Sequence, residues 1–280
     1  MNFWTCFVEI LCLSCLPLLL IGLAVWGCRE LYCFFVGNQS GYRLIKAASV
    51  LSIPLREVGH AMMAVIFWHR LEEVQLLNLS DPDGEFGFVE HSYNPRNPIA
   101  LLGNFFYALG PVVLGLFAVS LIFLTCFHGV LPAYFDEIRA LGEVDANVGE
   151  YLKAAFSFIP KMFTLGGAAV WLRILGCVLL LFLCLGIYVS PVEIFEAVSG
   201  ILILIALMLA VSGVMMLFDD RVMRIALSGF RSFSTVVTAL FLVVLVFAVG
   251  ALVLGAMFGL VRTLFGLDRM PDLDQNSFET

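Results

Sequence analysis

The stretch Arg56-Glu57-Val58-Gly59-His60 is the part of this sequence whose residue types and spacing could carry chemistry. In a helical His-Glu-x-x-His arrangement, two imidazoles one turn apart hold Zn²⁺, and the glutamate deprotonates a water bound to the metal. Here Glu57 and His60 keep their places, but Arg56 stands where the first histidine would be. A guanidinium is permanently charged and has no lone pair for a metal. The spacing instead favours a contact of Arg56 with Glu57 or His60, which is the least costly way to hold these charges at membrane depth.

The composition places these charges in a membrane protein. Hydrophobic residues make up 61% of the 280 residues, mean hydropathy is +1.02, and only 13% of residues are charged. Soluble domains carry about 25% charged residues, so lipid must cover most of this surface. The net charge of −7 comes with no basic patch, which argues against a nucleic-acid partner. The eight cysteines lie mostly in apolar runs and are interpreted as small buried residues.

Six stretches are long and apolar enough to cross the hydrocarbon core, which takes about 20 residues. They cover about residues 3–27, 44–68, 99–127, 168–189, 192–218 and 236–262. The predicted fold class is therefore an all-α integral membrane protein of about six transmembrane helices, with one membrane domain over residues 1–267 and a mobile tail over 268–280. The first stretch has neither a basic leading region nor a clear cleavage site, so we expect a retained helix.

Two longer polar segments separate these spans. In residues 69–97, two β-favouring runs flank the turn Asp81-Pro82-Asp83-Gly84, which predicts a β-hairpin. An open sheet edge cannot face lipid, so this hairpin should lie at the interface or pack against protein. Residues 128–166 are acidic and are expected to lie outside the membrane.

Basic residues near the ends of short loops predict the topology. Six alternating spans would place two clusters on one cytoplasmic side and both termini outside. The clusters are Arg29, Arg43 and Lys46 after the first span, and Arg221, Arg224 and Arg231 after the fifth.

The residues around the motif add a family context. The motif continues with Ala61, and the chain then has the hairpin region at about 72–90, Asn94-Pro95, and Gly103-Asn-Phe-Phe-Tyr-Ala-Leu-Gly110-Pro111. Over about residues 44–125, this order resembles the site-2 protease family of intramembrane metalloproteases, peptidase family M50. That family starts a membrane helix with His-Glu-x-Gly-His-Ala, followed by a membrane-associated hairpin and a helix with Gly-Pro. The likeness to a bacterial branch implies a multi-pass protein of the bacterial cytoplasmic membrane.

The resemblance implies a zinc site with three protein ligands, and this sequence departs from it. Arg56 replaces the first ligand, and no aspartate in a Leu-Asp-Gly context supplies the third. The remaining candidates for metal ligands are His60, His91, Glu193 and Asp219. By the same resemblance, Gly110 and Pro111 would line the active cavity, with Gly110-Pro111 as a kink or a point of close packing. Asn94, in the Asn-Pro element of the resemblance, is interpreted as ordinary turn chemistry.

Three functions stay open at this stage. The leading interpretation is a protease scaffold without cofactor that binds a membrane or peptide partner and does not cleave it. The alternative is an active zinc peptidase in which His60, His91 and either Glu193 or Asp219 bind the metal and Glu57 is the base. A transporter-like protein comes third, since the pseudo-symmetric halves that it would need are not visible as a repeat.

Overall fold

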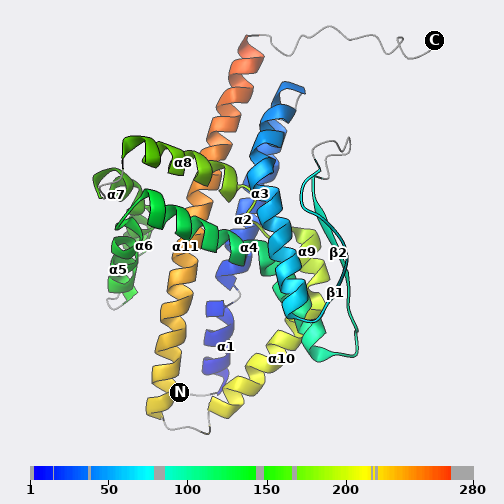
Figure 1. Cartoon of the computed structure of the whole chain (residues 1–280). Helices are drawn as coiled ribbons and strands as arrows, with labels where there is room; N and C mark the ends of the chain where they lie inside the picture. Colours follow the sequence, from blue (N-terminus) through cyan, green and yellow to red (C-terminus); the bar gives the residue numbers. More distant parts are fainter. Residues whose placement is uncertain are drawn as a thin grey trace, which may run out of the picture.

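A computed structural model describes residues 3–14, 16–36, 39–78, 86–142, 148–165, 169–215, 217 and 220–265. Long helices make up most of this chain, and one small hairpin lies at their edge (Figure 1). The elements in chain order are α1 (Phe3–Ser14), α2 (Leu16–Val36), α3 (Gln39–Ile66), β1 (Arg70–Gln75), β2 (Phe88–Ser92), α4 (Pro98–Cys126), α5 (Val130–Gly142), α6 (Val148–Phe156), α7 (Phe158–Thr164), α8 (Val170–Cys184), α9 (Pro191–Glu196), α10 (Val198–Met215) and α11 (Asp220–Leu264).

Among the described residues, four helical segments are long and apolar enough to cross a membrane: Pro17–Val36, Pro98–Cys126, Val198–Met215 and Leu227–Leu264. The predicted membrane environment is thereby supported, whereas the predicted number of about six spans is not confirmed. The span expected at 44–68 lies in α3, whose charged residues lower its hydropathy. The span expected at 168–189 contains α8, an apolar helix of only 15 residues.

Two predicted spans have different limits in the structure. The stretch 3–27 is divided between α1 and α2, and the stretch 192–218 is divided between α9 and α10. The last predicted span, 236–262, is part of the 45-residue helix α11. The predicted tail 268–280 lies outside the described residues.

The predicted hairpin is present as a two-stranded antiparallel sheet along the outer side of α3 (Figure 1). Leu71 pairs with His91 and Val74 pairs with Val89, and the register shifts between Leu71 and Glu73. Such a shift is a bulge, which bends one strand and increases its twist. The turn predicted at 81–84 lies outside the described residues.

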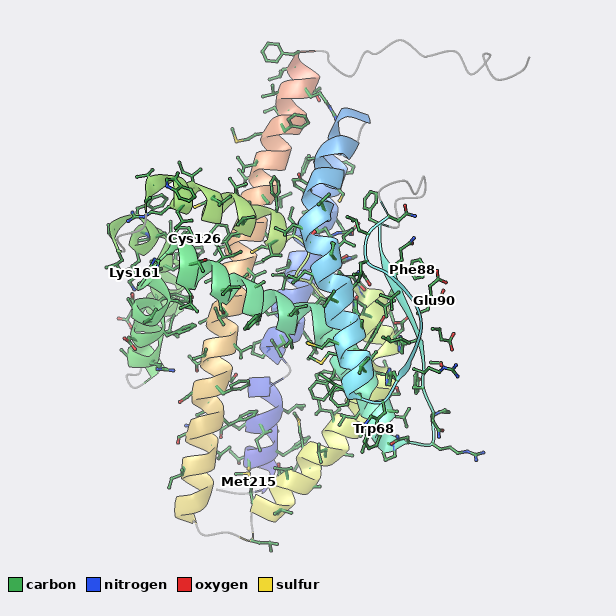
Figure 2. All side chains as sticks on the ribbon, viewed as in Figure 1. Trp68, Phe88, Glu90, Cys126, Lys161 and Met215 are labelled. Atoms are coloured by element: carbon green, nitrogen blue, oxygen red, sulfur yellow. The ribbon has the colours of Figure 1, made fainter. Side chains whose placement is uncertain are left out.

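Residues 128–165 contain the helices α5, α6 and α7, which gather at the far end of α4 from the hairpin (Figure 2). Lys161 of α7 forms an ion pair with Glu137 of α5 and donates to the Ser157 hydroxyl at 3.2 Å. Burial opposes ionisation of Glu137, but hydrogen bonds from Lys161 and Ser157, together with the charge of Lys161, outweigh it and lower the pKa of that carboxyl. None of these three helices is among the candidate spans.

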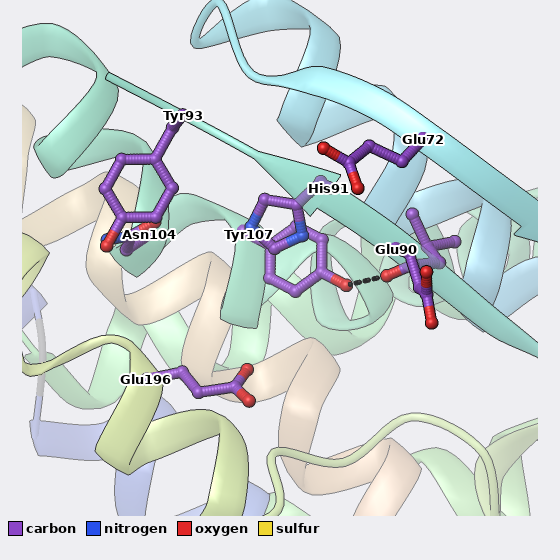
Figure 3. A pocket seen from close by; sticks show the side chains of 8 residues that line it. Glu72, Glu90, His91, Tyr93, Asn104, Tyr107 and Glu196 are labelled. Atoms are coloured by element: carbon purple, nitrogen blue, oxygen red, sulfur yellow. Dashed lines mark hydrogen bonds between the residues drawn. The ribbon is translucent and has the colours of Figure 1, made fainter. Parts of the chain in front are cut away.

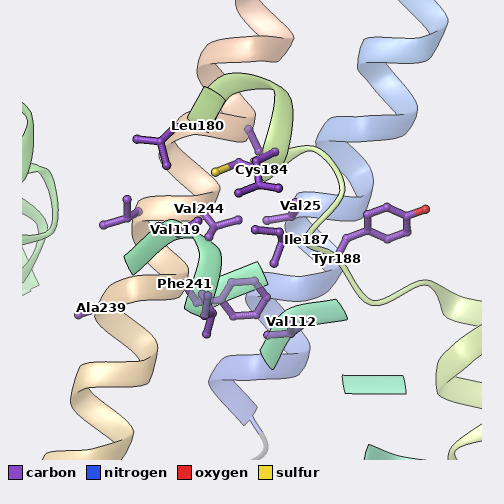
Figure 4. Close-up of a cluster of buried hydrophobic side chains, with 14 of the residues drawn as sticks. Val25, Val112, Val119, Leu180, Cys184, Ile187, Tyr188, Ala239, Phe241 and Val244 are labelled. Atoms are coloured by element: carbon purple, nitrogen blue, oxygen red, sulfur yellow. The ribbon is translucent and has the colours of Figure 1, made fainter. Parts of the chain in front are cut away.

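The centre of the fold is a cluster of buried apolar side chains where α2, α4, α8 and α11 meet (Figure 4). Val25, Val112, Leu180, Phe241 and Val244 are among the most deeply buried members of this cluster. The cluster holds α4 and α8 across the long axis of α11.

Helices α2 and α11 pack side by side through a Gly-x-x-x-Gly pair. A side-chain carbon at Gly255 would lie 2.6 Å from the Tyr32 ring, and one at Gly259 would lie 2.5 Å from the Phe35 carbonyl oxygen. In membranes such small residues let helix backbones approach closely.

The contacts at both ends of this pair give the direction of α1–α2 relative to α11. Arg231, near the start of α11, forms an ion pair with Glu9 of α1, and Arg262, near its end, donates to the Val36 carbonyl at 3.4 Å. The segment α1–α2 therefore runs parallel to α11. The placement of the two basic clusters on one side of the membrane stays a prediction. Helices α4 and α8 lie across α11 instead of along it (Figure 1).

Helices α3 and α4 touch backbone to backbone at Gly59 and Gly110. A side-chain carbon on Gly59 would lie 2.6 Å from the Gly110 carbonyl oxygen and 2.9 Å from the nitrogen of Pro111. The predicted close-packing role of Gly110-Pro111 is therefore confirmed, and Pro111 lies inside the helix α4.

This contact predicts that Gly59→Ala destabilises the protein. The added carbon meets backbone atoms that cannot move aside independently, so overpacking should cost about 1–3 kcal/mol. Thermal unfolding in detergent micelles measures the loss. The control is Gly27→Ala in α2, where nothing lies within 4 Å of the new carbon and helix propensity should improve. Equal stability of the two variants would contradict the proposed constraint.

Candidate functional site

The polar residues of the Arg56–His60 motif contact a carboxylate from a distant part of the chain. Arg56, Glu57 and His60 lie on α3, and Glu193 comes from α9. The Arg56 guanidinium pairs with Glu193 and also contacts Glu57 Oε1 at 3.3 Å, while His60 Nε2 lies 3.0 Å from Glu193 Oε1. We call these four residues the charge cluster. Glu57, His60 and Glu193 are all buried, so the charges of the cluster balance one another away from bulk water.

Both ring nitrogens of His60 face a hydrogen-bond acceptor, the Tyr107 carbonyl oxygen and the Glu193 carboxylate. Its Nδ1 lies 2.9 Å from the Tyr107 carbonyl oxygen, which can only accept, so Nδ1 carries a proton. The other ring nitrogen faces the Glu193 carboxylate. A neutral imidazole would then present a lone pair to an anion. The contact therefore requires one more proton, held by the imidazole or by the carboxyl group.

Glu193 is held by the local structure of α9. The Ser190 backbone N–H donates to Glu193 Oε2 at 2.7 Å, and the Glu193 backbone N–H donates to the Ser190 hydroxyl at 3.2 Å. This is a capping box with Pro191 in the first turn. One carboxylate oxygen therefore fixes the helix start, and the other remains directed at Arg56 and His60.

Aromatic contacts hold Arg56 as well. Its guanidinium lies over the Tyr188 ring at 4.8 Å from the centroid, and Arg29 of α2 lies 5.1 Å from the same centroid. A guanidinium over an aromatic face gains cation–π energy, most of all where water is excluded. The Arg56 Nε is buried without a hydrogen-bond partner in the described part of the chain. Arg56 is thus fixed by Glu193 and Tyr188.

A series of aromatic rings continues from the charge cluster toward the hairpin. The Tyr107 ring lies 4.5 Å from His60 and 4.1 Å from His91, and the His91 ring stacks on His69 at 4.9 Å and 9°. His69 in turn stacks on Tyr93 at 5.0 Å. Its Nε2–H donates to the Ala100 carbonyl, since a carbonyl oxygen can only accept.

His91 is uncharged at neutral pH. It lies on β2, outside the candidate membrane spans. Burial, together with the neighbouring His69 and His60, lowers the pKa of His91 to about 4. Its ring therefore acts as a neutral part of the aromatic series, and it does not compensate nearby negative charge.

A cavity of about 500 Å³ opens beside this series, between β2, α4 and α9 (Figure 3). Tyr107 and Asn104 of α4 line one side of it, and the Tyr107 hydroxyl donates to the Val89 carbonyl at 3.1 Å. The charged residues of the lining are Glu72, Glu90 and Glu196. Since His91 is neutral, the cavity carries net negative charge.

The structure brings together only part of the predicted site. Glu57, His60 and Glu193 converge around Arg56, and His91 contacts the same Tyr107 ring as His60. Asn94 is instead exposed in the turn before α4, where its side chain accepts from the Arg96 backbone N–H at 3.0 Å. This local hydrogen bond holds the Asn94 side chain in the turn, as its interpretation as a turn residue expects.

Two further outcomes concern metal binding. Asp219 lies outside the described residues. Within the part of the chain that the structure describes, no three His, Cys, Asp or Glu side chains come together as a group that could hold a metal ion.

Sequence reasoning missed Tyr107, Tyr188, His69 and Ser190. Only Ser190 carried a signal of its own, because Ser-x-x-Glu with proline in the first helical position is the pattern of a capping box. The aromatic residues are recognisable only once the helices are placed.

No protein-family model, curated protein or solved structure matches this chain. The site must therefore be interpreted from its own geometry.

We expect Arg56 and Glu193 to be energetically coupled. Arg56→Leu leaves two carboxylates buried without their cation and should cost about 3–5 kcal/mol of unfolding free energy. Adding Glu193→Gln removes one of the stranded charges, so the double variant should lose less than the sum of the single losses. Denaturant unfolding of all four proteins in micelles gives the coupling.

The control for this cycle is Glu30→Gln, which breaks the exposed pair between Arg29 and Glu30. Exposed pairs contribute about 0–1 kcal/mol, so this variant should unfold almost like the wild type. Additive losses for Arg56→Leu and Glu193→Gln would contradict the coupling.

Proposed function

We propose that this chain is a multi-pass membrane protein with a site-2-protease-like arrangement that does not hydrolyse peptides and instead binds a peptide segment of a membrane partner. The observation that carries the proposal is that Arg56 and His60 both contact the same oxygen of the Glu193 carboxylate. The same carboxylate and imidazole would be needed as metal ligands in an active enzyme.

Electrostatics support an inactive site. For Zn²⁺ to bind at His60 and Glu193, the Arg56 guanidinium would have to leave its buried partner, since two cations cannot share the position. Without a metal there is no activated water, and Glu57 has no proton to remove from it. Glu57 then serves as the second counter-ion of Arg56, which its 3.3 Å contact allows.

The membrane topology belongs to the same proposal. We take α3 and α8 as two further membrane-embedded segments beside the four long apolar helices. Helix α3 carries the charge cluster and packs along α4, so its charges can be paired inside the protein.

The edge of β2 supports peptide binding. In an antiparallel strand, both main-chain groups of one residue point to the same edge, and every second residue points the same way. The Val89 carbonyl faces Tyr107, so the main-chain groups of Val89 and His91 face the cavity and not β1. An extended segment could add to this edge through main-chain hydrogen bonds. The acidic lining favours a segment that carries lysine or arginine.

The second candidate function is an active peptidase with an altered ligand set. It is favoured by one feature, the hydrogen bond from His60 Nδ1 to the Tyr107 carbonyl. Zinc-bound histidines commonly donate their second N–H in this way. In that case Arg56 would have to move away when metal binds.

Zinc analysis separates the two functions. Protein purified from zinc-replete cells should contain far less than one zinc per chain, because Arg56 excludes the metal. Arg56→His supplies the missing ligand and should raise the zinc content toward one per chain. Adding His60→Ala to that variant should remove the gained zinc. Stoichiometric zinc in the wild type would establish the peptidase candidate instead.

Peptide binding has its own prediction. A dye-labelled peptide of alternating lysine and valine should bind the purified protein, as followed by fluorescence anisotropy. Glu90→Gln with Glu196→Gln should weaken its binding about tenfold, the effect of losing about 1.4 kcal/mol, while Glu73→Gln on the exposed face of β1 should not.

A matched peptide of alternating glutamate and valine provides the negative control. If it binds as tightly as the lysine peptide, or if the Glu90 and Glu196 changes have no effect, the cavity is not the binding site.

A further inference from the structure

A second cavity, of about 420 Å³, lies between α1, α4, α10 and α11. Its walls are formed almost entirely by apolar side chains, among them Ile10, Phe105, Leu109, Leu204, Met208 and Val237. The cavity is separated from the acidic one by α4, and no residue lines both. In Figure 1, α1 lies between the lower parts of α10 and α11, which border this cavity.

The cavity is open toward the outer, apolar face of the helices. Leu207 and Phe233 belong to its lining and are nevertheless 49% and 67% exposed. Both lie within candidate membrane spans, Val198–Met215 and Leu227–Leu264. What lies outside this opening is therefore the hydrocarbon of the bilayer.

The apolar lining of this cavity favours a hydrocarbon chain over water or a peptide. Water needs two to four polar partners to remain in a buried cavity, and this lining is almost wholly apolar. A peptide segment would leave backbone N–H and C=O groups unpaired, at several kcal/mol each. A hydrocarbon chain has no group that requires a partner.

The depth of the cavity fits one leaflet. Its α11 lining ends at Thr238, 11 residues after the start of the span at Leu227. At 1.5 Å per residue this is about 16 Å, roughly half of a hydrocarbon core of about 30 Å. At the shallow end, Arg231 pairs with Glu9 and has a side chain that is 60% exposed. A guanidinium in this position can still meet a phosphate at the membrane surface.

We propose that this cavity holds one acyl chain of a bilayer phospholipid, whose headgroup lies beside Arg231. The proposal is independent of the function proposed for the charge cluster. The lipid chain fills space against Phe105 and Leu109 of α4 and completes the packing between α10 and α11 that protein side chains leave open.

Photolabelling tests the proposal. The full chain is reconstituted in vesicles of phosphatidylethanolamine and phosphatidylglycerol that contain a phosphatidylglycerol with a diazirine in one acyl chain. After irradiation, peptide mass spectrometry should find adducts concentrated on lining residues such as Met208 and Val237. Val237→Phe, which fills the cavity, should reduce these adducts about tenfold, equivalent to about 1.4 kcal/mol of binding.

Leu202→Phe is the matched control, because Leu202 is 63% exposed on α10 and does not line the cavity. It should leave the adducts unchanged. A second blocking variant, Val211→Trp at the cavity mouth, guards against misfolding of the first, and both must elute and melt like the wild type.

Two results would overturn the proposal. One is labelling spread evenly over all exposed apolar residues and unaffected by both blocking variants. The other is labelling of the cavity by a diazirine fatty acid but not by the phospholipid, which would assign the cavity to a free fatty acid.

Discussion

The backbone contact between Gly59 and Gly110 is the constraint on which the site depends. Neither residue has a side-chain carbon, so α3 and α4 approach until main-chain atoms touch. At that separation the imidazole of His60, one residue further, meets the carbonyl of Tyr107, one turn earlier on α4. A larger separation would leave the buried imidazole without an acceptor, and an unpaired polar group inside a membrane protein costs several kcal/mol. The position of His60 therefore depends on the close contact of the glycine pair as well as on its charged neighbours.

The charge cluster then resolves the problem of holding ionised groups inside an apolar fold. Arg56 brings a charge that cannot be removed by losing a proton. Glu193 arrives from α9 with one oxygen already used in a capping box, so its second oxygen has a fixed direction. Tyr188 covers the guanidinium from another side. Because each partner is fixed by its own element, little conformational entropy is lost when they meet. The ion pairs and the cation–π contact of Arg56 thus involve protein groups alone.

The sequence predicted those features that depend on local chemistry. The low charge content predicted a membrane environment, the β-favouring runs predicted the hairpin, and the residue type of Arg56 excluded it as a ligand. The lengths and limits of the helices could not be predicted in full, because hydropathy does not measure the packing of α3 along α4 and does not show that α8 has only 15 residues. Glu193 was one of two equal candidates until α9 was placed beside α3. The ring series through Tyr107 and His91 was not predictable either, since its members come from separate elements.

Helix α4 lines both cavities. Asn104 and Tyr107 face the acidic cavity, whereas Phe105 and Leu109 face the apolar one, and Gly110 follows directly. Since about 3.6 residues make a turn, these residues occupy about two turns. Side-chain packing is dense and does not deform continuously. The segment that lines the apolar cavity with Phe105 and Leu109 also places Tyr107 against His60. This one segment of α4 therefore forms the wall between the two cavities and also supplies the carbonyl that accepts from His60.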